Sequence, residues 1–213
     1  MVESVLIVGA GSGLSTSLAR LCASKEMKVV LAARNIEKLK DLKKEISAET
    51  IKCDATNIKS VTDLFKKTDK IIGVPNLVIY NPSKSLGGSI IDLDPKKAYD
   101  AINITCYGGF LVAQQAAKRM LKKKRGSIFF TGATASVKGF PKSSVFAMGK
   151  FGLRGLAQSL ARELHPQNIH IGHFIIDGGI GREDYGSYKT IHPDEIAKVY
   201  LQFHNQDKSA WSW

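Results

Sequence analysis

The chain has 213 residues, of which 44% are hydrophobic and 23% are charged. These values are typical of one globular domain (1–213) whose core needs no disulfide or metal to hold it together. The three cysteines, Cys22, Cys53 and Cys106, form no C-x-x-C pair, which argues against a disulfide framework or zinc site and favours a reducing compartment. No run approaches the ~18 apolar residues of a membrane span and no basic leader starts the chain. We therefore expect a soluble, cytoplasmic protein with no bound metal and no membrane contact.

The formal net charge of +12 is the one unusual bulk property. A strongly basic surface can bind nucleic acid. The lysines, however, concentrate in two helix-like stretches, 37–46 and 118–125. In the first, apolar residues at helical spacing leave the charges on the solvent face, and the second falls where a helix should end and cations offset its dipole. We interpret the charge as a solvated surface, which makes nucleic-acid binding the least favoured function.

Six short runs rich in β-branched residues are predicted strands, at 4–10, 29–33, 50–54, 76–80, 127–133 and 169–176. Most are continuously apolar, as strands covered on both faces must be. Helical patterns lie between and after them, with leucine stripes that begin at Leu14 and Leu153 and a last helix at 192–203. This alternation predicts an α/β fold, a single doubly wound parallel sheet (Rossmann) of six or seven strands with helices on both faces.

The stretch GAGSGL, residues 9–14, connects the first predicted strand to the first predicted helix. Glycines at such a turn let a pyrophosphate approach the backbone, and the helix N-terminus supplies amide hydrogens and a positive dipole. The second strand ends in Ala33-Arg34, where an NAD-binding chain would place a carboxylate for the ribose 2′-hydroxyl. Because an arginine suits a 2′-phosphate, the sequence predicts NADP(H) in preference to NAD(H).

These residues and their order resemble the short-chain dehydrogenase/reductase family, and the resemblance covers nearly the whole chain. The glycine loop matches the family's G-x-x-x-G-x-G, with Ser15 in place of the last glycine. Asp54 looks like the aspartate that hydrogen-bonds adenine, and Asn81 is the one match to an Asn-Asn-Ala-Gly motif. Asp177-Gly178-Gly179-Ile180 follows the sixth strand like the family's Pro-Gly-x-Val, without the proline. The resemblance implies these cofactor-binding residues: Gly9, Gly11, Ser12, Gly13, Leu14, Arg34, Asp54, Ala55, Asn81, Lys150, Gly178 and Ile180.

The family's active-site motif is Tyr-x-x-x-Lys on a helix, with both side chains on one face. In the segment SSVFAMGKFG (143–152), Lys150 is similar to the motif lysine and Phe146 occupies the tyrosine's position. The family's serine lies thirteen residues before the tyrosine, which is Ala133 here. In the family the lysine binds the nicotinamide ribose and lowers the tyrosine's pKa, whereas phenylalanine cannot donate a proton. The candidate catalytic positions are Lys150, Asn103 (the family's water-ordering asparagine), Phe146, Ala133 and Thr134, which adjoins the vacant serine position.

Ser136, Ser143 and Ser144 lie near the two vacant positions in the sequence, and Tyr107 lies four residues after Asn103 on the same helical face. We interpret each first as a packing or capping group. Gly149 and Gly152 lie inside the motif helix, where each glycine costs about 1 kcal/mol relative to alanine. They predict a close approach by a cofactor ring or by a helix of a second subunit. The second is favoured because family members commonly dimerise through this helix, so we expect a homo-oligomer, a dimer or tetramer.

The segment between Ile180 and the last helix leaves room only for a short substrate lid. Beyond that helix, Trp211 and Trp213 suggest a stub of the family's last strand or an oligomer contact.

The leading functional hypothesis is an NADP(H)-dependent oxidoreductase that moves a hydride to or from a small organic substrate with atypical acid/base chemistry. Substrates that need no acid at oxygen, an iminium or an activated alkene, suit such a site. Lys150 or a water ordered by Asn103 is the candidate proton source. The alternative is a catalytically inactive NADP(H)-binding sensor or scaffold.

Overall fold

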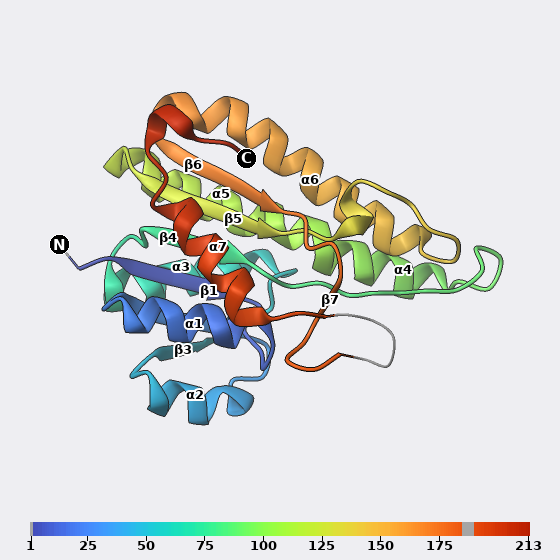
Figure 1. Cartoon of the computed structure of the whole chain (residues 1–213), viewed down its shortest axis with the longest axis horizontal. Helices are drawn as coiled ribbons and strands as arrows, with labels where there is room; N and C mark the ends of the chain where they lie inside the picture. Colours follow the sequence, from blue (N-terminus) through green and yellow to red (C-terminus); the bar gives the residue numbers. More distant parts are fainter. Residues whose placement is uncertain (1, 185–189) are drawn as a thin grey trace.

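One parallel sheet runs through the molecule (Figure 1). The computed structural model describes residues 2–184 and 190–213. The sheet has the order β3-β2-β1-β4-β5-β6, which confirms the predicted doubly wound arrangement with six strands. Its strands are β1 (Ser4–Val8), β2 (Lys28–Ala33), β3 (Glu49–Lys52), β4 (Leu77–Tyr80), β5 (Gly126–Thr131) and β6 (Ile169–Phe174). The chain reverses direction across the sheet between β1 and β4, and the crevice at such a point is where open α/β sheets bind ligands.

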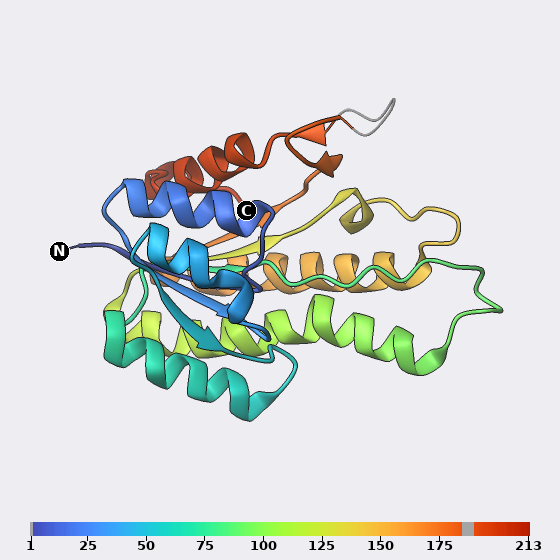
Figure 2. The same ribbon diagram turned by 90° about the horizontal axis from the view of Figure 1, so that it is seen from below.

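Helices cover both faces of the sheet, as predicted (Figure 2). One face carries α1 (Leu14–Ser24), α2 (Lys40–Glu45) and α7 (Pro193–His204). The other carries α3 (Ile58–Ile72), α5 (Gly108–Lys123) and α6 (Ser144–Leu164), and α4 (Pro95–Ile102) leads into α5. A separate pair of short strands, β7 (Gly179–Ile180) and β8 (Thr190–Ile191), follows β6. Within the described ranges, no helix is long and apolar enough to cross a membrane.

The apolar runs become strands because both of their faces are buried. In β1, Leu6 and Val8 pack with α3, α5 and α6, while Val5 and Ile7 pack with α1 and α7. All five residues of β1 are buried. A strand in this position has no wet face, so it cannot show polar alternation.

A π-helical segment, Asn103–Tyr107, joins α4 to α5 and packs against α6. A Cβ atom at Gly149 would lie 2.9 Å from the Cβ of Thr105, and one at Gly152 would lie 2.8 Å from the Sγ of Cys106. The expectation of a cofactor ring or second subunit at these glycines was therefore wrong. They are small because another helical segment of the same chain passes over them.

Gly108 directly follows the π-helical segment, and its surroundings leave no room for a side chain. A Cβ there would lie 2.9 Å from the carbonyl oxygen of Ala55 and against the hydroxyl of Tyr80, which itself donates a hydrogen bond to the Ile104 carbonyl.

We expect G108A to lower the free energy of unfolding by about 2 kcal/mol, because the added methyl group overpacks the core. The matched control is G155A in α6, where no atom is within 4 Å of the added Cβ and helix propensity predicts a gain of about 1 kcal/mol. Urea unfolding of both variants measures the contrast, and equal effects would contradict it.

The C-terminal residues pack on the β6 edge of the sheet without forming a strand, so the predicted strand stub was wrong. The Trp211 ring stacks on His170 at 4.5 Å, and its Nε1 donates to the carbonyl of Gln206. Phe203 stacks on His170 at 4.6 Å. This stack gives Trp211 a packing role in the monomer, because aromatic burial stabilises irregular chain as well as strands.

Candidate functional site

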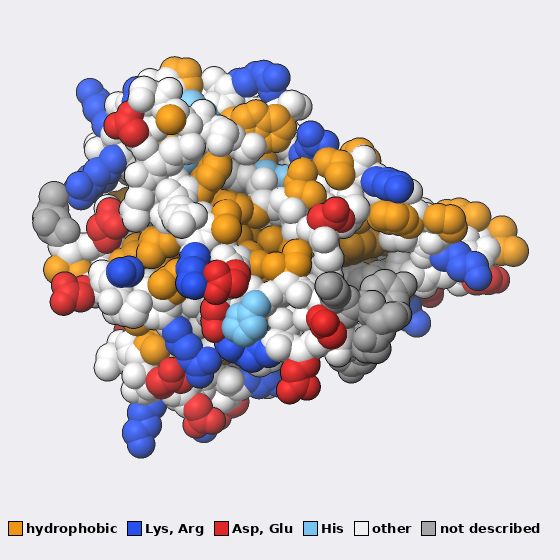
Figure 3. All heavy atoms as spheres, viewed as in Figure 1, with side chains coloured by type: hydrophobic (Ala, Val, Ile, Leu, Met, Phe, Trp, Pro, Cys, Tyr) orange, Lys and Arg blue, Asp and Glu red, His pale blue; other side chains and the backbone are white. Residues whose placement is uncertain are grey.

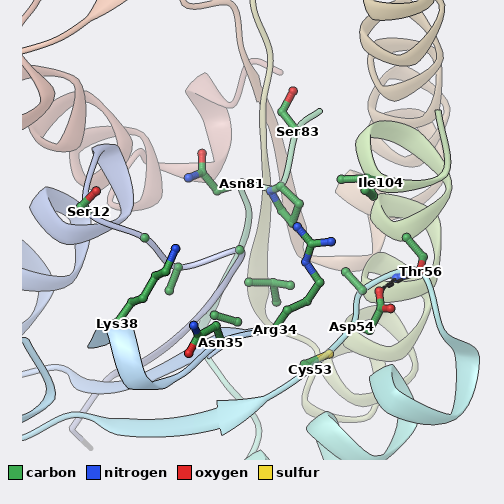
Figure 4. Close-up of a pocket in the computed structure, with 17 residues that line it drawn as sticks. Ser12, Arg34, Asn35, Lys38, Cys53, Asp54, Thr56, Asn81, Ser83 and Ile104 are labelled. Atoms are coloured by element: carbon green, nitrogen blue, oxygen red, sulfur yellow. Dashed lines mark hydrogen bonds between the residues drawn. The ribbon is translucent and has the colours of Figure 1, made fainter. Parts of the chain in front are cut away.

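A pocket of about 510 Å³ opens at the carboxyl ends of β1 to β4 (Figure 4). Its walls come from the glycine loop, from the ends of β2 and β3, and from the turn after β4. Predicted cofactor-binding residues account for much of the lining: Gly9, Gly11, Ser12, Arg34, Asp54, Ala55 and Asn81. The fold thus brings together residues that are scattered over more than seventy positions of the sequence.

The glycine loop has the backbone that the sequence led us to expect. Gly9 has φ +80, and a Cβ there would lie 2.6 to 2.7 Å from atoms of Pro82, so only glycine fits. Gly13 is the N-cap of α1, where no described side chain caps the helix and the first turn holds no acidic residue. The Thr16 amide donates to the Gly13 carbonyl at 2.9 Å, and the amide hydrogens of Leu14 and Ser15 remain available to an anion.

Ser15, which replaces the family's last loop glycine, connects the loop to β4. Its Oγ donates a hydrogen bond to the Gly9 carbonyl at 3.2 Å and accepts one from Asn81 Nδ2 at 2.7 Å. Thr16 Oγ1 donates to the Gly11 carbonyl at 2.8 Å. The loop is therefore held by side chains of its own helix and of the neighbouring strand end.

Two cationic side chains extend into this pocket from the end of β2 and the turn after it. Figure 4 shows Arg34 and Lys38 rising from below the glycine loop, and both line the pocket. Lys38 is exposed, as the helical spacing predicted, but that spacing did not indicate that its side chain would line the pocket. The signal that was missed is its position four residues after Arg34, in the turn that must begin at the same sheet edge.

Asp54 lies just after β3 with one carboxylate oxygen engaged locally. Its Oδ1 accepts hydrogen bonds from the backbone N and the Oγ1 of Thr56, at 3.0 and 2.8 Å. No hydrogen bond or ion pair within the described residues involves Oδ2. That oxygen is free to accept a hydrogen bond from a ligand in the pocket.

A second pocket of about 330 Å³ adjoins the first and shares Asn81 and Ser83 with it. The remaining predicted residues that line it come from the loop, the segment after β5, α6 and the segment after β6: Gly13, Leu14, Ala133, Phe146, Lys150, Gly178 and Ile180. Phe146 and Ala133 therefore lie beside Lys150, where the family's tyrosine and serine would be. The two pockets form one continuous groove.

The other hydroxyl candidates do not line either pocket. Thr134 Oγ1 donates to Asp177, and Ser136 Oγ accepts from the backbone N of Ala133 at 3.1 Å. Tyr107 stacks on Phe110 at 6.0 Å and is exposed.

Asn103 begins the π-helical segment outside the lining of both pockets. The expected short lid falls partly on residues 185–189, which lie outside the described residues.

Lys150 is 3% exposed and is partnered by a single hydrogen bond, from Nζ to the Thr131 carbonyl at 2.8 Å. The Phe146 ring lies beside it, 5.7 Å from Nζ to the ring centre. No carboxylate of residues 2–184 or 190–213 forms an ion pair with it. Burial therefore lowers the pKa of Lys150 to about 8.

His173 of β6 is a second buried titratable group near the lysine. Burial, and then the charges of Lys150 and Arg154, lower the pKa of His173 to about 4. The histidine is neutral at pH 7. Among the residues that line the second pocket, Lys150 is the charged one.

Comparisons with known proteins agree with this geometry. A family profile described as short chain dehydrogenase matches residues 3–180. An uncharacterized oxidoreductase of Staphylococcus aureus (strain USA300) is 28% identical over 214 residues, which cover 95% of this chain and 91% of the relative.

Solved structures give the same result. A short-chain dehydrogenase from Rhodopseudomonas palustris superposes with a TM-score of 0.87 at 33% identity, over 99% of this chain and 95% of that one. A metagenomic short-chain oxidoreductase solved in complex with NADP shares the fold, with a TM-score of 0.86 at 24% identity over 98% and 93% of the two chains. The profile spans most of the sequence, and the chain therefore belongs to the short-chain dehydrogenase/reductase family of oxidoreductases.

Proposed function

We propose that the protein is an NADP(H)-dependent oxidoreductase that acts on small organic substrates without the family's tyrosine and serine. The observation that carries the proposal is the single groove that runs from the uncapped N-terminus of α1 to the buried Lys150. A nicotinamide dinucleotide supplies the hydride when bound. Every other part of the chemistry must come from the chain.

The groove suits a dinucleotide along its whole length. Gly9, Gly13 and the free amides of α1 favour a pyrophosphate at the middle. Asp54 and Ala55 would hold the adenine at one end. At the other end, Lys150 would hold the nicotinamide ribose, and Gly178 and Ile180 would form one wall beside the ring.

The preference for NADP(H) rests on Arg34 and Lys38. Two cations at the end of β2 favour a 2′-phosphate over a ribose hydroxyl, because charge-assisted hydrogen bonds to phosphate are the stronger ones. Glu37, which lies between them in the sequence, pairs with Lys40. Both side chains line the larger pocket.

Lys150 is the group best suited to supply a proton. Its ammonium has one hydrogen bond to the backbone and lines the pocket beside Phe146. With a pKa of about 8, it is largely protonated at pH 7 yet gives up a proton more easily than an exposed lysine. When an activated alkene is reduced, the carbon next to the one that receives the hydride gains the proton from Nζ, and solvent reprotonates the neutral amine. A cationic iminium needs only the hydride.

Ketone reduction should be gained when the family residues are restored. F146Y and A133S place hydroxyls on two positions that line the same pocket as Lys150. We expect the double variant to reduce simple ketones with NADPH about 100-fold faster than wild type, since a positioned general acid contributes that much or more. The assay follows NADPH consumption with a ketone, an enone and an iminium.

Wild type should consume NADPH only with the enone or the iminium. If wild type consumed NADPH with none of the three and the double variant did with the ketone, the sensor alternative would replace the catalytic one. If neither protein reacted, the placement of Phe146 and Ala133 at the reacting centre would be contradicted.

We also propose self-association through α5 and α6. A groove of about 280 Å³ between these helices is lined mainly by apolar side chains, among them Phe110, Leu121, Leu156 and Leu160. Phe110 and Phe151 are 42% and 45% exposed. Apolar surface of this kind favours a second copy of the chain, in keeping with the family's habit of pairing through these helices.

A further inference from the structure

An arginine just beyond the second pocket makes a bidentate contact that nothing in the proposed function requires. Arg182 donates from Nη1 to Asp194 Oδ2 and from Nη2 to Asp194 Oδ1, each at 3.0 Å. A fork-to-fork pair of this kind fixes direction as well as distance. It joins the segment after β6 to the first turn of α7.

Helix α1 takes part in the same contact. Ser17 Oγ donates to Asp194 Oδ1 at 2.5 Å and lies 3.4 Å from Arg182 Nη2. His192 accepts a hydrogen bond from the Asp194 backbone N and so caps α7. On the face seen in Figure 3, basic, acidic and histidine side chains meet where α7 begins. We call Arg182, Asp194 and Ser17 the Arg182 clamp.

The clamp lies directly behind one wall of the second pocket. Gly178 and Ile180 line that pocket, and Arg182 follows Ile180 by two residues. In the strip Gly178–Ile180, Gly179 and Ile180 pair with β8, and the backbone N of Gly181 donates to the Ile191 carbonyl at 3.2 Å. The clamp therefore connects this wall to α1, whose N-terminus forms the opposite part of the groove.

Because it is rich in glycine, the strip depends on contacts with its neighbours to stay ordered. Three of the four residues 178–181 are glycines, which lose more conformational freedom on ordering than any other residue. The salt bridge itself is about half exposed, with Arg182 at 51% and Asp194 at 45%. Such pairs add little to global stability, so the clamp's effect should be local order in the strip.

We propose that the Arg182 clamp is a positioning device that holds Gly178–Ile180 against the nicotinamide end of the cofactor. The inference rests on the proposed function, because it assigns the clamp to one half of the dinucleotide groove. Arg182 acts through the strip and does not line either pocket. It is a positioning residue, distinct from Lys150.

The test compares two nucleotides that differ in the nicotinamide half. R182Q and D194N are titrated with NADPH and with adenosine 2′,5′-bisphosphate, which fills only the adenosine half. We expect the Kd for NADPH to rise about tenfold, because the strip must be ordered on binding, while the Kd for the bisphosphate stays within about twofold of wild type. The control is K198Q, which removes an exposed salt bridge to Glu195 on the same helix and should change neither Kd.

The outcomes separate the inference from the proposed function. Equal NADPH Kd values for R182Q, D194N and wild type would contradict the positioning role of the clamp. An equal loss of affinity for both nucleotides would also contradict it, because it would indicate damage to the whole groove. If R182Q fails to fold, the Kd values of D194N alone test the inference, because this variant keeps an oxygen acceptor for Ser17. If wild type binds the bisphosphate but not NADPH, or binds neither, the proposed function fails first.

Discussion

Replacing Lys150 by methionine (K150M) should abolish turnover and make the protein more stable. We expect kcat to fall at least 100-fold, because a general acid in this position contributes about that much. Methionine keeps the volume and the apolar stem but removes the charge that burial disfavours. A residue that lowers the stability of the protein but supports its activity is expected at a functional site.

The size of the stability gain follows from the pKa of Lys150. Burial lowers it from 10.5 to about 8, a difference of 2.5 that corresponds to about 3 kcal/mol of lost stability at pH 7. Methionine leaves the Thr131 carbonyl without its partner, which costs about 1 kcal/mol. The variant should therefore be about 2 kcal/mol more stable than wild type at pH 7.

The same shift gives a pH dependence with a definite sign. Between pH 8 and 10.5 the unfolded state holds more protons on this lysine than the folded state does, so wild-type stability rises with pH relative to K150M. Denaturant unfolding at pH 7 and pH 10 measures the difference between the two proteins. The control is K66M, which removes an exposed lysine of α3. The difference in stability between K66M and wild type should be the same at both pH values. A K150M protein less stable than wild type at pH 7 would mean that Lys150 is charge-compensated.

Removing both cations at the end of β2 should abolish the preference for NADPH. We expect R34S and K38S each to raise the Kd for NADPH about tenfold and the double variant about 100-fold, since a hydrogen bond to a charged group contributes about 1.5–3 kcal/mol. Binding of NADH, which lacks the 2′-phosphate, should change by less than about threefold. Fluorescence titration of wild type and the three variants with both nucleotides gives the Kd values.

The matched control is R162S near the end of α6, an exposed arginine whose hydrogen bond goes to a carbonyl of its own helix. It removes one positive charge far from the groove and should leave both Kd values unchanged. If R34S weakened NADPH and NADH equally, Arg34 would hold the ribose or the adenine and would not select the 2′-phosphate.

The fold was predictable because its signals are local. Each central strand is buried on both faces and therefore reads as an unbroken apolar run, and Gly9 lies in a strand-to-helix turn where its own φ of +80 favours glycine. The position of Lys150 four residues after Phe146 likewise lies on one helix. Periodicity and spacing within a short window are enough for such features.

Other parts of the site depend on contacts between distant residues, which a single sequence does not display. Ser15 and Asn81 are 66 positions apart, and Arg182 and Ser17 are 165 apart. Gly149 and Gly152 indicated a close approach but not by which segment, and the answer was the π-helical turn of the same chain. Helical spacing indicates which face of a helix is polar, and it placed Lys38 on that face. It does not indicate what the face borders, which here is the cofactor pocket.

Cofactor binding is tested most directly by titrating the wild-type protein with NADPH and, in parallel, with NADH, followed by the fluorescence of the reduced nicotinamide. We expect saturable NADPH binding in the micromolar range and NADH binding at least tenfold weaker, about 1.4 kcal/mol or more in free energy. The absence of saturable binding of either nucleotide up to about 1 mM would contradict the proposed oxidoreductase and leave the buried charge of Lys150 without a ligand to explain it.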